Sequence, residues 1–121
     1  RGAAPAWNNL GIARDEQGDA AGAEDAYRRA LALDPGYWQA RLNLGIALAR
    51  AGRAGEAREA LDAVVAAVPA QPDAHRELGA LYAGPLADRA KARLHWNAFL
   101  RHASGHSEAA AVRRRLAELP P

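Results

Sequence analysis

The sequence predicts an all-α fold built from stacked helical hairpins, and three observations support this prediction. Alanine, the best helix former, accounts for 33 of the 121 residues, whereas threonine is absent and valine and isoleucine are few. Apolar residues recur at the spacing of an amphipathic helix. Similar residues also recur 34 positions apart, which is typical of a repeat protein. We expect a single domain over residues 1–121.

The internal repetition defines the predicted units. Three triplets of identical residues share the 34-residue offset: Ala6, Ala40 and Ala74; Leu10, Leu44 and Leu78; Gly11, Gly45 and Gly79. We therefore expect units at about 4–37, 38–71 and 72–105, and a last helix at about 107–119.

The first unit predicts two antiparallel helices joined by a turn at Gly18 and ended by Pro35. The predicted packing positions are Trp7, Leu10 and Gly11 on the first helix and Ala23, Tyr27, Ala30 and Leu31 on the second. Small residues are expected where two helices approach closely. On the outer side, acid–base pairs four residues apart, such as Glu24 with Arg28, favour an exposed helix face.

The third unit departs from the pattern by one extra residue in its turn, at 84–88. Its second helix is therefore shifted by one position, so that Ala92, Trp96, Phe99 and Leu100 take the inward places. In the last helix, Val112, Leu116 and Leu119 share one apolar face. Such a helix is suited to cover the end of a stack.

These residues resemble the tetratricopeptide repeat family, whose 34-residue pattern is W-x2-L-G-x2-Y, then A-x3-F, then P. Trp7, Leu10, Gly11, Ala23, Tyr27, Ala30 and Pro35 match it in the first unit, and fewer residues match in the second and third. The resemblance covers residues 4–105. It implies a right-handed α-solenoid with a capping helix. It also implies a non-catalytic protein–protein interaction scaffold that binds a peptide or helix of a partner protein in a concave groove.

The resemblance further implies which side chains line this groove, because the first helix of each unit faces it. They are Asn8, Asn9, Ile12, Asp15 and Glu16 of the first unit, Leu42, Asn43, Ile46 and Arg50 of the second, and Asp73, Arg76 and Glu77 of the third. Some members of the family hold a peptide's terminal carboxylate with lysines, an arginine and asparagines. Here Asn43 suits such a clamp, but Asn8 and Asp73 occupy the lysine positions and Glu77 the arginine position. We expect no carboxylate capture.

Several groove side chains have two interpretations. Asn9 and Asn43 recur at one position, where an amide can hydrogen-bond either a bound peptide or a neighbouring helix. Ile12, Leu42 and Ile46 form either an exposed apolar strip for a partner or a contact between units. The pair Tyr37 and Trp38, at a helix start, suits either a binding hot spot or packing between units; the other aromatic residues are expected in the core.

Two other functions are alternatives to groove binding. End-to-end stacking through the uncapped Trp7 end predicts a homo-oligomer. Arg113, Arg114 and Arg115 suit weak binding to nucleic acid or an anionic surface, although three arginines on a polar helix face are more often a solvated surface. The net charge of +2 favours no polyanionic partner. The start of the chain, RGAAPAW, suggests a segment of a longer protein and shows no targeting signal.

The sequence predicts no enzyme, cofactor site or metal site. Cysteine is absent, and the only serines, Ser104 and Ser107, lie in the last loop. His102 and His106 are four residues apart, but the Ser104-Gly105 break separates them, and no acidic residue follows His106 or His95 at the spacing of a zinc enzyme. No apolar run is long enough to predict a membrane span.

Overall fold

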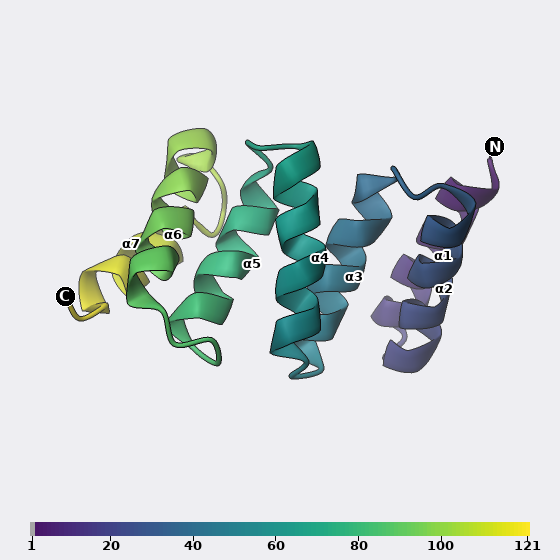
Figure 1. Cartoon of the computed structure of the whole chain (residues 1–121), viewed down its shortest axis with the longest axis horizontal. Coiled ribbons are helices and arrows are strands. Elements are labelled where there is room, and N and C mark those ends of the chain that lie inside the picture. The colour runs from purple at the N-terminus through teal and green to yellow at the C-terminus, as the bar shows by residue number, and fades with distance from the viewer. Residues whose placement is uncertain (1) are drawn as a thin grey trace.

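Seven α-helices form three antiparallel hairpins and a final single helix in the computed structural model, which describes residues 2–121. The helices are α1 (Ala3–Glu16), α2 (Ala20–Leu33), α3 (Trp38–Arg50), α4 (Ala54–Ala67), α5 (Pro72–Ala83), α6 (Arg89–Ala103) and α7 (Ala109–Glu118). Each helix packs on its neighbours in the chain, so the hairpins stand in a row with the two termini at opposite ends (Figure 1). This arrangement is an all-α solenoid, as predicted.

Local chemistry explains where the helices begin and turn. The Asp19 carboxylate accepts a hydrogen bond from the Gly22 amide, 2.9 Å, and caps the start of α2. Gly18 and Gly52 end the first helices of their hairpins in the left-handed conformation, with φ of 83° and 79°, which glycine adopts without steric cost. In the third hairpin the extra residue moves this conformation to Ala87, with φ of 51°.

Each hairpin closes where a glycine of the first helix meets a bulky side chain of the second. A Cβ on Gly45 would lie 2.8 Å from Cγ of Leu61, and one on Gly79 would overlap the Trp96 indole. The predicted one-residue shift in α6 is confirmed, because Trp96 and Phe99 are both buried. The glycines therefore allow the close approach that the repeat pattern predicted.

Two predicted packing positions at the N-terminal end differ from the expectation. Leu10 is 38% exposed, although its equivalents Leu44 and Leu78 are 4% and 0% exposed. Trp7 is only half-buried, with the guanidinium of Arg29 above its ring, 4.9 Å from the centroid. The prediction that Leu10 packs inward is wrong, because no helix within residues 2–121 covers that side of α1.

The other end of the row is covered. Val112 of α7 is buried in a cluster with Trp96 and Phe99 of α6, and Leu116 and Leu119 pack against the same cluster. The helix is slightly shorter than the predicted 107–119, since Glu108 is its N-cap residue. Within residues 2–121, none of these helices has the length and apolar character needed to cross a membrane.

Candidate partner-binding groove

The first helices of the hairpins, α1, α3 and α5, contact one another and form a continuous surface, which we call the groove face. Successive residues of a helix are rotated by about 100°, so Asn43, Ile46 and Arg50 lie on the side of α3 opposite Leu44 and Leu48. Leu44 and Leu48 are buried in the main core. The groove face is therefore the side of the first helices that hairpin packing leaves free.

The α1 residues of this face differ widely in accessibility. Asn9, Ile12 and Glu16 are exposed, with Ile12 at 38%. Asp15 is half-buried and accepts a hydrogen bond from the Tyr27 hydroxyl, 2.8 Å. Burial and, after it, this bond raise the pKa of Tyr27 above its ordinary value. Asp15 is thus part of the hairpin's internal structure, whereas Ile12 and Glu16 are free to meet a partner.

Asn43 contacts a neighbouring helix. Its Nδ2 donates a hydrogen bond to Oδ1 of Asn8 on α1, at 3.0 Å, and Asn8 is only 5% exposed. The helix-to-helix interpretation therefore holds for Asn43, while Asn9, the repeat equivalent of Asn43, is exposed. The sequence did not identify Asn8 as the bonding partner, because Asn8 and Asn43 are 35 residues apart and do not occupy equivalent positions.

The predicted apolar strip is smaller than expected. Leu42 is 8% exposed and belongs to the core, so its assignment to an exposed strip is wrong. Ile46 is half-buried and packs against that core. Ile12 and the free side of Ile46 remain as apolar surface on the groove face.

In the third hairpin, the predicted groove charges are paired with one another. The Arg76 guanidinium lies 3.2 Å from the Glu77 carboxylate and 3.7 Å from that of Asp73. Nε2 of His106, in the loop before α7, lies 3.3 Å from the Asp73 carboxylate. The sequence pointed to His106 only as a metal candidate, and no pattern indicated its contact with Asp73. These groups form a polar cluster at the C-terminal end of the groove face.

Arg50 lies between two hollows at the carboxyl ends of the first helices. One hollow is lined by Asp15, Gly18, Ala20, Ala47, Arg50 and Ala51, and the other by Ala49, Arg50, Glu77, Ala80, Leu81 and Pro85. Small apolar side chains dominate both. Arg50 is exposed, and none of the ion pairs found in residues 2–121 includes it.

The charge of the groove face is opposite to that of the chain. The predicted groove residues include four carboxylates, Asp15, Glu16, Asp73 and Glu77, but only two arginines, Arg50 and Arg76. This gives an excess of two negative charges, whereas the whole chain carries +2. The predicted groove positions therefore carry a net negative charge.

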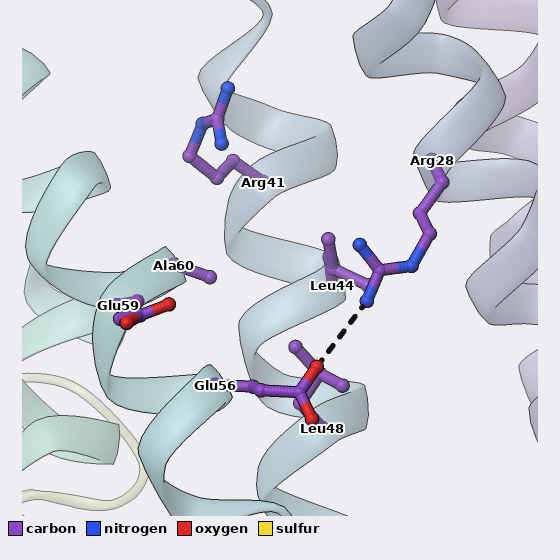
Figure 2. Close-up of a pocket in the computed structure, with 7 residues that line it drawn as sticks. All are labelled: Arg28, Arg41, Leu44, Leu48, Glu56, Glu59 and Ala60. Carbon is purple, nitrogen blue, oxygen red and sulfur yellow. Dashed lines mark ion pairs between the residues drawn. The ribbon is translucent and has the colours of Figure 1, made fainter.

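A separate pocket lies on the opposite side of α3, between α2 and α4 (Figure 2). Leu44, Leu48 and Ala60 line it together with four charged residues, Arg28, Arg41, Glu56 and Glu59. The Arg28 guanidinium lies 3.7 Å from the Glu56 carboxylate, and the dashed line in Figure 2 marks this ion pair.

Ion pairs around this pocket join the first and second hairpins. Arg53 at the start of α4 contacts Glu24 of α2 at 2.7 Å and Glu56 at 2.8 Å, and Glu24 also pairs with Arg28, as predicted. Burial raises the pKa of Glu24, but hydrogen bonds from Arg53 and Arg28 lower it by more, so the net shift is downward. Arg28 and Glu56 of the pocket therefore contribute to the stacking of the hairpins.

Two histidines, the buried His75 and the half-buried His95, form a contact between α5 and α6. Nδ1 of His75 lies 3.0 Å from Nδ1 of His95, and Nε2 of His75 lies 2.7 Å from the Pro69 carbonyl oxygen. Because a carbonyl only accepts, Nε2 of His75 carries the proton and donates to it. Nδ1 of His75 then accepts from Nδ1 of His95. His102 is exposed, and within residues 2–121 no three His, Asp or Glu side chains are grouped to hold a metal ion.

The aromatic pair at the start of α3 and the three arginines of α7 were the other candidate contact residues. Tyr37 and Trp38 are half-buried and pack against two core clusters, which agrees with packing between units. Arg113 and Arg114 are exposed on α7. The guanidinium of Arg115 lies over the Trp96 ring, 4.8 Å from its centroid.

Comparisons with known proteins agree with this architecture. The first tetratricopeptide repeat domain of Spaghetti (RPAP3), bound to the HSP90 peptide SRMEEVD, superposes with a TM-score of 0.87 at 21% identity, covering 96% of this chain and 94% of that chain. The Arabidopsis OM64 tetratricopeptide repeat domain gives 0.88 at 16% identity, covering 96% and 95%. MamA gives 0.78 at 26% identity, and this chain, 88% covered, spans 61% of it.

The sequence itself carries the family signature. A search of curated proteins finds no match. The tetratricopeptide repeat family model, however, matches residues 8–72 and 42–90, which together span more than half of the chain. With its helical hairpins and 34-residue period, the chain belongs to the tetratricopeptide repeat family.

Proposed function

We propose that the chain is a non-catalytic scaffold that binds a short protein segment on its groove face, with Arg50 and Ile12 among the contact residues. The family and fold are those of protein-interaction modules, and one structural relative is bound to a peptide. The observation that carries the proposal is the pair of hollows on either side of Arg50, which are lined mainly by small apolar residues. Such hollows accept the side chains of an extended or helical segment.

The chemistry of the groove face favours a basic and aliphatic segment over one with a terminal carboxylate. Glu77 and Asp73 surround Arg76 and neutralise the cation nearest to them. The Asn43 amide already donates a hydrogen bond to the buried Asn8, so both side chains take part in the contact between α1 and α3. Glu16, by contrast, is exposed beside Ile12 and suits a lysine or arginine of the partner.

Selection from a phage-displayed library of random peptides tests this proposal. We expect the selected peptides to combine aliphatic with basic residues and to lose binding to the Ile12→Lys and Glu16→Lys variants, both altered at exposed positions. Leu94→Asp is the matched control, because Leu94 is 61% exposed on α6, away from the groove face. Circular dichroism checks that all three variants keep their helices. Equal binding to wild type and both groove variants would overturn the assignment.

A further inference from the structure

The pocket between α2 and α4 has a counterpart one repeat further along the chain. The counterpart positions lie 34 residues later on α4 and α5, and 35 residues later on α6, because the third hairpin has one extra turn residue. Three of the lining residues, Arg41, Leu48 and Ala60, correspond in this way to His75, Tyr82 and His95. The chain therefore contains two versions of one site between successive hairpins.

In the second version, the imidazole ring of His95 occupies the site. The ring is stacked on that of Tyr82, with an angle of 5° between the two ring planes and 5.7 Å between their centroids. Its Nδ1 lies 3.0 Å from Nδ1 of His75, and the centroids of these two rings are 5.2 Å apart. The site thus accommodates one aromatic ring, packed on one neighbour from α5 and hydrogen-bonded to another.

In the first version, the chain supplies no such ring. Ala60 carries a single methyl group at the position equivalent to His95, and Figure 2 shows this methyl directed toward Leu44. A cavity of about 180 Å³ remains there, and Leu44 and Leu48 form its apolar wall. An apolar cavity of about 150 Å³ is large enough to hold benzene. The first version therefore has room for one aromatic ring.

The polar contact beside the ring also has an equivalent in the open pocket. Nε2 of His75 donates a hydrogen bond to the Pro69 carbonyl oxygen, at 2.7 Å. In the open pocket, Nη2 of Arg41 donates to the carbonyl oxygen of Pro35, the repeat equivalent of Pro69, at 3.0 Å. None of the ion pairs found in residues 2–121 includes Arg41, and its guanidinium has further N–H donors. Because a guanidinium only donates, a ring bound beside it must present an acceptor.

We propose that the open pocket binds a neutral imidazole ring, presented by a histidine side chain of a partner protein, at the position that His95 occupies one repeat later. A neutral imidazole has one unprotonated nitrogen, which accepts from Arg41, while its apolar face packs on Leu44 and Leu48. In the filled version the ring belongs to a polypeptide chain, which supports a side chain as the occupant. The pocket lies on the opposite side of α3 from the groove face, so the two proposals stand or fail separately.

NMR titration of the whole chain with N-acetyl-L-histidine methylamide at about pH 8, where imidazole is neutral, tests this proposal. We expect saturable shifts of the Leu48 and Ala60 amides with a dissociation constant on the order of 1 mM, because one ring buries little surface. N-acetyl-L-leucine methylamide, the control ligand, is expected to cause no saturable shift. Equal binding of the two ligands, or no saturable shift with either, would overturn the proposal. Free L-histidine that binds more than about tenfold more tightly than the blocked form would overturn the assignment to a partner protein.

Two substitutions test where the ring lies within the pocket. Ala60→His supplies a ring from α4 itself and is expected to abolish binding, whereas Ala63→His, at an exposed position of the same helix, is expected to bind as wild type. Arg41→Leu removes the donor and is expected to weaken binding about tenfold. Unchanged binding by Arg41→Leu, or by a folded Ala60→His, would refute the assignment. Circular dichroism identifies the folded variants, and Arg41→Leu alone decides the matter if Ala60→His does not fold.

Discussion

Replacing equivalent leucines of different repeats by alanine separates the effect of sequence from that of tertiary environment. Leu10 and Leu78 occupy the same repeat position, yet their exposures are 38% and 0%. Each substitution removes three carbon atoms, worth roughly 0.8 kcal/mol each when fully buried, or about 2.4 kcal/mol. At Leu78 the enclosed cavity adds to this loss, which gives about 3–4 kcal/mol. At Leu10 roughly six-tenths of the transfer term applies and solvent reaches the site, which gives about 1.5 kcal/mol.

Urea denaturation followed by circular dichroism measures both losses, with Leu44→Ala as a second buried comparison. We expect equal m-values and a free energy of unfolding that falls by about 2 kcal/mol more for Leu78→Ala than for Leu10→Ala. Losses of the same size would refute the reasoning, because they would show that Leu10 is as enclosed as its repeat equivalents.

Three further perturbations follow from the polar contacts. Burial, and after it the charges of His75 and Lys91, lower the pKa of His95 in the folded state, against an opposing effect of Asp62. The folded state therefore favours the neutral imidazole. The stability that His95 contributes is fully present above its unfolded pKa of about 6.5 and is lost as pH falls through its folded-state pKa. Thermal unfolding at stepped pH measures this loss, and a flat profile that His95→Gln leaves unchanged would contradict it. Asn43→Ala leaves the buried oxygen of its α1 partner unpaired and is expected to cost about 1–3 kcal/mol in urea unfolding, against under about 0.5 kcal/mol for the exposed Asn9→Ala. Arg53→Ala is expected to lower the melting temperature slightly in dilute buffer and not at all in molar salt, since Arg53 and Glu56 are solvent-exposed and Glu24 is only partly buried. A loss that persists in salt would argue against a screened ion network.

Much of the fold could be predicted because it depends on local pattern and on repetition. The hairpins follow from apolar spacing and turn glycines, and the shifted inward positions of α6, including Trp96 and Phe99, follow from one extra turn residue. The family model and the helical rows agree with this prediction. Repetition strengthens the prediction of the hairpins, because the same pattern of residues occurs in each of the three units.

The predicted groove positions were less accurate, because helical phase identifies a side of a helix but not what contacts it. Leu42 shares its side with Ile46 in the sequence pattern, yet Leu42 is enclosed by the core and Ile46 is only half-buried. The bond between Asn43 and Asn8 joins two helices at positions that the repeat does not equate. Such a contact depends on the distance and rotation between α1 and α3, which no local pattern encodes.

The sequence alone determined the helical class, the repeat period, the family and the residues that each helix presents to its own hairpin. Only the tertiary structure decided that Leu10 is exposed whereas Leu44 and Leu78 are buried, although all three satisfy the same motif. The physical reason is that burial is a property of neighbours. A repeat motif specifies the surface a unit offers, but whether that surface is removed from water depends on whether another helix lies against it.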